Sequence, residues 1–242
     1  MPKERKQPNK RRKTKATGNL TDERLKQRRA RFKALDCELR RLFPNTAIAL
    51  QHSSPWELLV AVILSAQCTD KKVNEVTQRL FKKYPTLEAY CVADPHEFER
   101  DIHQTGFYRN KTKHVLATAC RIRDAFGGKV PCTMEALLTL PGVARKTANI
   151  ILGTVCGVVE GIAVDTHVQR FAIRYDLTDY TDPVHIERDL MRVIPKRDWY
   201  TVTYRIIEYG RTIAPARRYD TSKDPLVALY PPAGKVFRVP RV

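Results

Sequence analysis

One lysine in this sequence has the setting of a covalent nucleophile. Lys146 lies at the predicted start of a helix, shortly after a Pro141-Gly142 turn that ends a shorter helix. The positive end of a helix dipole disfavours the protonated form of an amine, and partial burial would act in the same direction. A neutral amine near pH 7 is a nucleophile, so Lys146 is a candidate catalytic residue. Contact with a phosphate is the simpler role when this residue is taken alone.

A carboxylate at the start of a later helix is the second candidate catalytic group. Asp165 follows the apolar residues 162–164 and heads the sequence Asp165-Thr166-His167. A carboxylate that caps a helix accepts backbone N–H bonds, stays ionised and points out of the helix end, although such a cap needs no catalytic explanation. If the fold sets Asp165 opposite Lys146, the pair supplies an amine nucleophile and an anion that stabilises positive charge on a sugar.

The turn in front of Lys146 is also typical of an anion-binding site. It leaves backbone N–H groups without partners at a helix N-terminus, where the dipole favours negative charge. The formal net charge of +18 favours a polyanionic partner, so a DNA phosphate is the expected occupant. An ordinary corner between two packed helices is the alternative for this segment. The candidate DNA-binding residues of the turn are Gly142, Val143, Ala144, Arg145 and Thr147.

The elements that must position these residues are predicted to be almost entirely helical. Helix starts with a polar cap followed by proline occur at Ser54, Asp94 and Asp182, and Ser54 with Glu57 also has the form of a capping box. Apolar periodicity predicts helices over residues 56–67, 111–126, 133–140, 145–156, 182–194 and 197–210, with one more starting at Asp165. Strand patterns are scarce, so the fold class is all-α, with about ten helices. Five prolines after Arg211 predict an extended C-terminal segment rather than another helix.

The N-terminal segment is predicted to be a basic disordered tail over residues 1–20. Residues 1–16 carry eight lysines and arginines against one acid, and too few apolar groups to offset the entropy of ordering. A salt-sensitive DNA tether is the preferred interpretation, and a solubilising extension is the alternative. The longest purely aliphatic stretch, residues 58–64, is too short to span a membrane, and the N-terminus lacks the apolar core of a secretory signal.

The six cysteines do not form a metal-binding pattern such as C-x-x-C. They occupy positions 37, 68, 91, 120, 132 and 156. Their apolar or helical settings predict buried free thiols in a reducing cytoplasm. We therefore expect a cytoplasmic protein associated with the nucleoid, in a bacterial setting.

Three motifs in family order resemble the endonuclease III family of helix-hairpin-helix DNA glycosylases and abasic-site lyases. They are the hairpin at residues 140–149, the aspartate motif at 164–167 and the segment at 64–74, with a further similarity at 106–111. Together they extend the resemblance over roughly residues 53–211. The resemblance implies two helical lobes flanking a DNA-binding cleft, with a helix-hairpin-helix motif.

The resemblance also implies a domain organisation. A six-helix domain that contains the hairpin would span residues 48–158. The second lobe would combine residues 21–47 with residues 159–230, and residues 231–242 would form a C-terminal extension. The candidate lysine and aspartate then belong to different lobes and face each other across the cleft. The expected partner is double-stranded DNA with damaged bases or abasic sites, bound by a monomer.

The activity that the resemblance implies is base excision repair of oxidised pyrimidines in duplex DNA, followed by β-elimination at the abasic site. Lys146 would attack C1′ of a flipped nucleotide and form a Schiff base, while Asp165 would help to activate the amine. Adenine-removing mismatch glycosylases resemble this fold but lack that lysine and carry a large extra C-terminal domain. An abasic-site lyase with weak base excision, and a non-catalytic DNA-binding module, are the alternatives.

Three further DNA contacts follow from the same resemblance. Gln67 matches a residue that fills the gap left by the flipped base, and Phe107 matches the position of an apolar wedge. His167 belongs to the aspartate motif and is the third candidate. A helix C-cap is the alternative role for Gln67, and a core aromatic is the alternative for Phe107.

The sequence departs from the family where a cofactor would bind. The family usually carries a C-x6-C-x2-C-x5-C loop after the last helix, whose thiolates hold a [4Fe–4S] cluster. The residues at those spacings are Ala214, Thr221, Asp224 and Tyr230. No cysteine follows Cys156, so we expect no iron–sulfur cluster and no other cofactor. Order in this loop would come from packing of Leu226, Val227, Leu229 and Tyr230.

A second departure lies in the hairpin. Ala144 stands where the family normally has the second glycine of the turn. If this residue required a positive φ, alanine would cost roughly 1 kcal/mol. The backbone N–H that would contact a phosphate is retained in either case.

Overall fold

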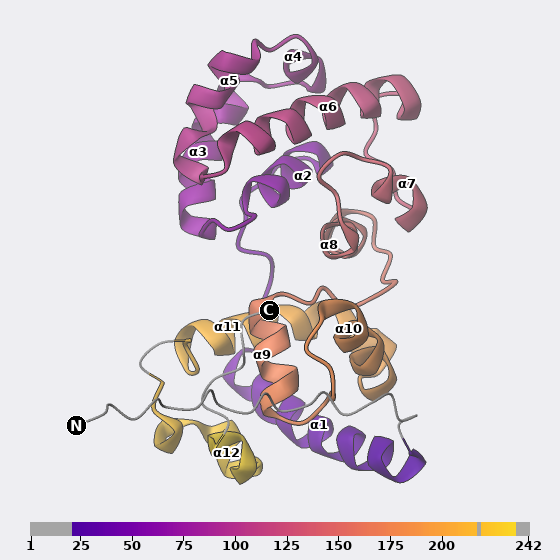
Figure 1. Ribbon diagram of the computed structural model, residues 1–242, viewed down its shortest axis with the longest axis vertical. Helices are drawn as coiled ribbons and strands as arrows, with labels where there is room; N and C mark the ends of the chain where they lie inside the picture. Colours follow the sequence, from indigo (N-terminus) through magenta and orange to yellow (C-terminus); the bar gives the residue numbers. More distant parts are fainter. Residues whose placement is uncertain (1–20, 217–218, 236–242) are drawn as a thin grey trace, which may run out of the picture.

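A computed structural model describes residues 21–216 and 219–235, and over these ranges the chain is helical with no strand. The expected all-α fold class is confirmed. The predicted disorder of residues 1–20 lies outside the described residues, as do residues 236–242. Two groups of helices are stacked one above the other, with the long axis of the molecule passing through both (Figure 1).

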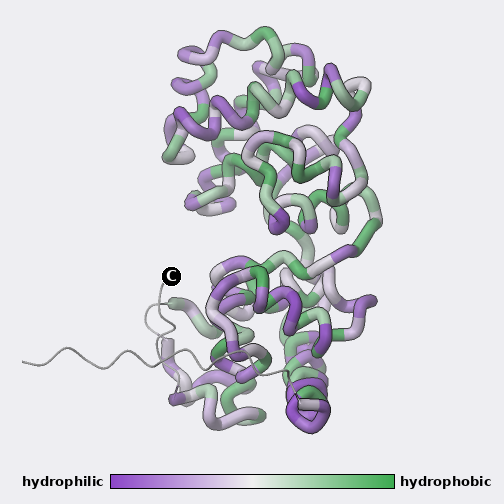
Figure 2. Tube along the Cα trace, turned by 45° about the vertical axis from the view of Figure 1, so that its right-hand side comes forward, coloured by the Kyte–Doolittle hydropathy of each residue, from purple (hydrophilic) through white to green (hydrophobic). Residues whose placement is uncertain are grey.

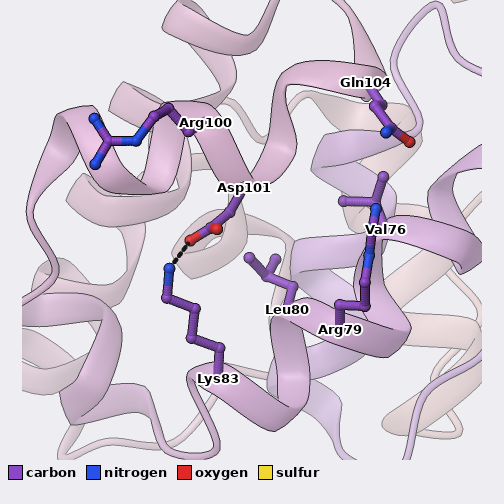
Figure 3. Close-up of a pocket in the computed structure, with 7 residues that line it drawn as sticks. All are labelled: Val76, Arg79, Leu80, Lys83, Arg100, Asp101 and Gln104. Carbon is purple, nitrogen blue, oxygen red and sulfur yellow. Dashed lines mark hydrogen bonds and ion pairs between the residues drawn. The ribbon is translucent and has the colours of Figure 1, made fainter.

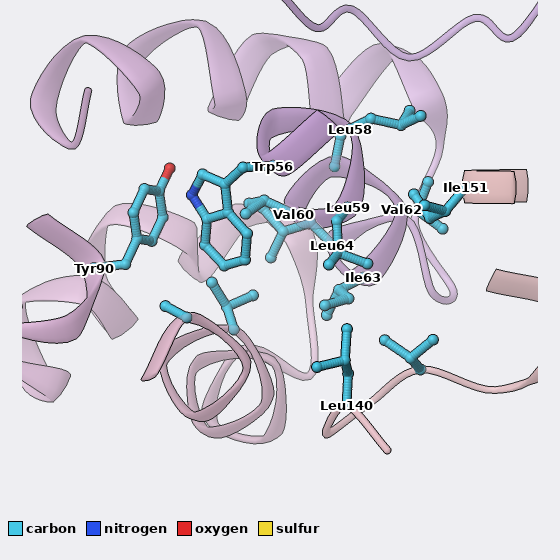
Figure 4. Packing of buried hydrophobic residues seen from close by; sticks show 14 of the residues in the cluster. Trp56, Leu58, Leu59, Val60, Val62, Ile63, Leu64, Tyr90, Leu140 and Ile151 are labelled. Atoms are coloured by element: carbon cyan, nitrogen blue, oxygen red, sulfur yellow. The ribbon is translucent and has the colours of Figure 1, made fainter. Parts of the chain in front are cut away.

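The upper lobe contains the helices from the middle of the chain. These are α2 (Pro55–Leu64), α3 (Asp70–Lys83), α4 (Leu87–Cys91), α5 (Pro95–Ile102), η1 (His103–Thr105), α6 (Tyr108–Phe126), α7 (Met134–Leu138) and α8 (Arg145–Val155). Its core is built around α2, in which every residue from Leu58 to Leu64 is buried. A helix that is apolar on all sides must be surrounded, and Figure 4 shows neighbouring side chains packed around it. Trp56 extends the cluster by an edge-to-face contact with Tyr90, with ring centroids 5.1 Å apart.

The lower lobe joins the two ends of the described chain. It consists of α1 (Asp22–Leu42), α9 (Thr166–Arg174), α10 (Pro183–Val193), η2 (Lys196–Asp198), α11 (Trp199–Thr212), η3 (Thr221–Lys223), α12 (Pro225–Leu229) and η4 (Pro231–Lys235). Phe32, Leu35 and Leu39 on one face of α1 are buried in the second hydrophobic cluster, with residues of α9 to α12. Figure 2 shows polar and apolar residues alternating along α1, as expected for a helix with one buried face.

Four of the predicted helix caps are present in the structure. Ser54, Asp94, Asp165 and Asp182 all cap helices with their side chains, as predicted. The helix predicted over residues 56–67 ends earlier, at Leu64. The capping box at its start also differs, because the Glu57 carboxylate accepts the backbone N–H of Ser53 at 2.6 Å rather than that of Ser54.

The prediction of an extended C-terminal segment is wrong. After Arg211 the chain forms η3, α12 and η4, because Asp224 caps α12 and Pro225 occupies its first turn, where a missing N–H is harmless. Leu226 is buried and Val227 and Tyr230 are partly buried against the lower core, as the packing prediction required. Leu229 is 50% exposed and does not contribute to that packing.

The prediction of six buried free thiols is also wrong. Cys132 and Cys156 form a disulfide, with their Cα atoms 5.7 Å apart, because the chain before α7 and the end of α8 return to one place. Cys37 is exposed, whereas Cys68, Cys91 and Cys120 are partly buried free thiols. Within the described residues no helix is both long and apolar enough to cross a membrane.

Candidate active site

The hairpin between α7 and α8 is held in a tight turn against α6. Gly142 has φ of +75°, a conformation that favours glycine, and a Cβ there would lie 2.7 Å from the His114 side chain. The Thr118 hydroxyl on α6 donates to the Pro141 carbonyl at 2.7 Å. Val143 is buried and faces the upper core. The turn is therefore rigid, and only Gly142 among its residues needs the freedom of glycine.

The start of α8 has no side-chain cap, a feature that it shares with α6 and α11. Ala144 precedes α8 with an extended backbone, φ −96° and ψ 171°, so the absent second glycine costs nothing in backbone strain. Alanine has no side-chain oxygen, and α8 has no side-chain cap, in contrast to α9 and α10. Ala144 and the next two residues are exposed. The first N–H groups of α8 are thus available to an acceptor from outside, such as a phosphate.

Lys146 and Asp165 occupy the starts of two different helices. Lys146 is the second residue of α8 and is exposed, so the partial burial considered for it is absent. Asp165 is half-buried, and its Oδ1 accepts N–H bonds from His167 at 2.8 Å and Val168 at 2.9 Å. These bonds fix the carboxylate at the start of α9.

The charges of both candidate catalytic groups act on the pKa of His167. Burial lowers the pKa of His167; the charge of Asp165 opposes this, while Arg170, Arg211 and Lys146 lower the pKa further. A guanidinium can only donate, so His167 Nδ1, which lies 3.2 Å from Arg170 Nη2, must accept. The imidazole is therefore neutral, with its proton on Nε2. Both the Lys146 amine and the Asp165 carboxylate lie within electrostatic reach of this one ring.

Gln67 and Phe107 are exposed on turns of the upper lobe. Gln67 has φ of 54° and Phe107 has φ of 49°, a left-handed conformation that is strained for residues other than glycine. The C-cap of α2 is Ser65, so the C-cap alternative for Gln67 is wrong. Phe107 is 62% exposed, which excludes the core alternative.

Sequence reasoning missed Lys111, which lies behind these two turns. Its side chain is buried, and its ammonium donates to the Leu64 and Thr105 carbonyls, each at 2.8 Å. Burial lowers the pKa of Lys111. The only sequence signal for Lys111 is its position as the last residue of the similarity at residues 106–111.

Arg145, which the sequence predicts to bind DNA, also joins the two lobes. Its Nε donates to Glu187 Oε2 of α10 at 2.8 Å, and Asn149 Nδ2 donates to Glu187 Oε1, also at 2.8 Å. Glu187 is buried, and a Cβ on Gly161 would collide with it. Because Nε of Arg145 is paired with Glu187, this residue has a structural role between the lobes that the sequence did not predict. Thr147 is half-buried in the first turn of α8.

The far end of α8 is attached to the lower lobe as well. The Tyr200 hydroxyl donates to Thr154 Oγ1 at 3.2 Å, and its ring lies against Gly153, where a Cβ would collide with it. Arg211 at the end of α11 pairs with Asp70 at the start of α3. Helix α8 thus carries the candidate nucleophile and is fixed to α10 and α11 along its length.

A cavity of about 220 Å³ lies away from these residues, between α3 and α5 (Figure 3). Lys83 at its edge forms ion pairs with Asp101 at 2.6 Å and Glu97 at 2.8 Å, so its charge is neutralised locally. None of the candidate catalytic residues lines this cavity.

Asp224, one of the four positions that correspond to the family's cluster cysteines, is the centre of a hydrogen-bond network. Asp224 is buried, and its Oδ2 accepts hydrogen bonds from the hydroxyls of Tyr209, Tyr219 and, at 3.4 Å, Tyr175. Burial raises the pKa of Tyr219 to about 12, so this hydroxyl keeps its proton. Ala214 is also buried. We refer to Asp224 and the three tyrosines as the aspartate–tyrosine network.

These residues do not fit an iron–sulfur cluster. A [4Fe–4S] cluster requires thiolate ligands, and the described part of the chain has none in this region. No group of three or more metal-binding side chains occurs within the described ranges. The single carboxylate of the aspartate–tyrosine network is already engaged by hydroxyl groups.

Comparisons with known proteins extend over the same residues. Residues 60–196 match the family model described as HhH-GPD superfamily base excision DNA repair protein. An endonuclease III from Synechocystis sp. is 49% identical over 180 residues, covering 74% of this chain and 82% of that protein. An endonuclease III from Bacillus subtilis is 43% identical over 189 residues, covering 78% and 86%.

Solved structures give the same result. A non-covalent endonuclease III–DNA complex has a TM-score of 0.82 and 39% identity, and covers 87% of this chain and 99% of that chain. A trapped endonuclease III–DNA covalent intermediate has a TM-score of 0.82, 38% identity and the same coverage. A thermostable thymine-DNA glycosylase, at 20% identity and a TM-score of 0.72, shares the fold. The chain therefore belongs to the HhH-GPD superfamily of base excision DNA repair proteins and, within it, to the endonuclease III family of bifunctional DNA glycosylases and abasic-site lyases.

Proposed function

We propose that this enzyme removes oxidised pyrimidines from duplex DNA and cleaves the resulting abasic strand through a Schiff base on Lys146. The observation that carries this proposal is the exposed Lys146 amine in the first turn of α8, whose charge acts on the pKa of His167 together with that of the Asp165 carboxylate at the start of α9. A structural relative was trapped as a covalent intermediate with DNA, which supports a covalent route.

The proposed chemistry assigns one role to each group. The Lys146 amine attacks C1′ of a flipped nucleotide, the bond from C1′ to the base breaks, and the base departs with the bonding electrons. Cleavage of the bond between C1′ and the ring oxygen then opens the sugar and gives a protonated Schiff base, which acidifies the C2′ proton. Removal of that proton expels the 3′ phosphate by β-elimination. Asp165 stabilises the positive charge that develops on the sugar and helps the amine to lose its proton.

The proposed DNA contacts use the upper lobe. The open N–H groups at the start of α8, with Gly142 and Val143 in the turn, bind a backbone phosphate without reading sequence. Gln67 fills the space left by the extruded base, and Phe107 enters the stack as a wedge. His167 lies beside the catalytic pair. The basic segments outside the described residues add salt-dependent affinity.

We also propose that the enzyme works without an iron–sulfur cluster, as a cytoplasmic monomer on chromosomal DNA. The lack of suitable ligands at Ala214, Thr221, Asp224 and Tyr230 supports the first part of this proposal. The two hydrophobic clusters support the proposal of domain boundaries near residues 48 and 158. Metal analysis of the purified protein tests the cofactor proposal, because stoichiometric iron and sulfide contradict it.

Borohydride trapping tests the catalytic proposal. Covalent adducts with both thymine-glycol DNA and abasic DNA are expected for the unmodified enzyme, and an adduct with abasic DNA alone indicates a lyase with weak base excision. Lys146→Ala is expected to abolish both adducts while DNA affinity stays within about threefold, since phosphate binding does not require this amine. Lys82→Ala, an exposed lysine on α3, is the matched control. No adduct from the unmodified enzyme on either DNA contradicts the proposal.

A further inference from the structure

The two turns that carry Gln67 and Phe107 have an unusual feature in common. Each turn contains one left-handed residue that is not glycine, and each such residue is exposed. A left-handed conformation costs of order 1 kcal/mol or more and persists only where surrounding structure enforces it. Something in the upper lobe must therefore hold both turns.

The two turns are joined through a single nitrogen atom. Lys111 Nζ donates to the carbonyl of Leu64, the last residue of α2, three residues before Gln67. The same nitrogen donates to the carbonyl of Thr105, the last residue of η1, two residues before Phe107. One ammonium group thus fixes the distance between the ends of α2 and η1.

The buried charge of Lys111 is poorly explained by stability alone. The side chain is only 4% exposed, and transfer of an ammonium group from water into a protein interior is costly. Its recorded hydrogen-bond partners are neutral carbonyls, one of which lies at a helix C-terminus where the dipole favours a cation. An apolar side chain of similar length would fill the space but would leave both carbonyls unpaired and the two turns independent.

We propose that Lys111 is a positioning residue, whose ammonium joins the ends of α2 and η1 and so holds Gln67 and Phe107 ready to enter the DNA stack together. This inference rests on the proposed roles of these two residues in DNA. Lys111 is separated from the DNA by the turns that it holds, and it acts through them rather than by contact with the substrate.

The test uses two DNA substrates that differ in their need for a wedge. Excision of thymine glycol from a matched duplex requires a stacked base to be displaced, whereas an abasic sugar has no base to unstack. Lys111→Met is expected to slow thymine glycol excision by about tenfold or more and to change trapping on abasic DNA by less than about threefold. Lys113→Met, on the exposed face of the same helix, is the matched control and is expected to change neither.

A variant that lacks both DNA-contacting side chains distinguishes a positioning role of Lys111 from general support of the fold. If Lys111 acts through the two turns, Lys111→Met adds less than about twofold to the defect of a Gln67→Ala, Phe107→Ala double variant. Equal losses on both substrates, a full additional loss in the double-variant background, or no loss of excision overturns the proposal. Should Lys111→Met not fold, as judged by circular dichroism, Lys111→Gln carries the same test because its amide can still donate to one carbonyl. Failure of the unmodified enzyme to trap abasic DNA refutes the proposed function itself, which these variants do not address.

Discussion

The hairpin α7–α8 and the C-terminal segment after α11 are both short parts of the chain, but they are held in place by different means. The hairpin lies within the loop closed by the disulfide between Cys132 and Cys156, and its turn requires the glycine at position 142. The C-terminal segment has no such link and is organised around a buried carboxylate that accepts three hydroxyl groups. The hairpin follows the family pattern closely, and the C-terminal segment departs from it.

This difference indicates which parts of the family pattern are replaceable. The hairpin must present backbone N–H groups in one geometry, so little substitution is tolerated at Gly142. The family's cluster, by contrast, fixes a loop, and any strong buried anchor at the same place can fix one. The aspartate–tyrosine network is such an anchor, since hydrogen bonds to a buried carboxylate are stronger than those between neutral groups.

The largest effect is expected when the carboxylate is removed from the aspartate–tyrosine network, which tests whether this network holds the C-terminal segment. Asp224→Ala removes the carboxylate that the three tyrosine hydroxyls share, although Tyr175 and Tyr209 still bond to each other, and it removes the cap of α12. A loss of about 4 kcal/mol in the free energy of unfolding is therefore expected. Urea unfolding monitored by circular dichroism measures it. Asp220→Ala, an exposed aspartate in the same segment, is the control and is expected to cost less than about 1 kcal/mol. Similar losses for both variants show that the network is not the anchor.

Removal of the covalent link tests the hairpin in the same way. Replacement of Cys132 and Cys156 by serine is expected to reduce the free energy of unfolding by about 3 kcal/mol, because the link spans 24 residues of sequence. Dithiothreitol is expected to lower the melting temperature of the unmodified protein and not that of the double variant. Cys37→Ser, an exposed free thiol, is the control. A melting temperature that is insensitive to dithiothreitol contradicts the disulfide.

Two substitutions within the hairpin sharpen the comparison further. Gly142→Ala forces a Cβ into a left-handed residue and against His114, so a loss of about 2 kcal/mol and weaker DNA binding are expected. Ala144→Gly is expected to leave DNA affinity unchanged or slightly tighter, because the backbone at Ala144 is extended. Fluorescence anisotropy with abasic duplex DNA measures both. If the two variants bind DNA equally well, the turn has a different conformation in the complex.

The smallest expected effect concerns His167, which lies between the hairpin and the C-terminal segment. Burial lowers its pKa below the ordinary value of 6.5, so the unfolded chain takes up a proton at a higher pH than the folded protein does. The contribution of His167 to the free energy of unfolding is therefore fully present above pH 6.5. This contribution is lost as the pH falls from 6.5 toward the pKa of His167 in the folded protein. His167→Gln is expected to remove up to about 1 kcal/mol of the difference in stability between pH 7.5 and pH 5.5. An unchanged pH dependence in the variant shows that His167 is not the group responsible.

The sequence predicted local features of the fold and the site well. Side-chain caps at Ser54 and Asp165 depend on contacts within three residues, and the structure contains them. The family motifs implied DNA contacts for Gln67 and Phe107, but the sequence placed Gln67 at the end of a helix. The left-handed conformations of both residues were not evident from residue type.

Most of the features that the sequence did not predict depend on partners far away in the chain. Lys111 binds a carbonyl 47 residues earlier, and Glu187 accepts from Arg145 42 residues earlier. No periodicity or local motif encodes such pairings. The disulfide was missed for the same reason. The helix α12 was missed because its proline, taken as a sign of extended chain, lies in the first turn, where proline is compatible with a helix.

The position of α1 has a consequence for synthesis of the chain. Helix α1 is translated before the other described helices, yet its apolar face packs against α10, α11 and α12, which are translated after the upper lobe. At ordinary rates of translation, roughly 10 s pass before these partners exist. The upper lobe can fold during that interval, while the apolar face of α1 stays uncovered. The many arginines and lysines on the remaining faces of α1 keep this helix soluble until its partner helices have been synthesised.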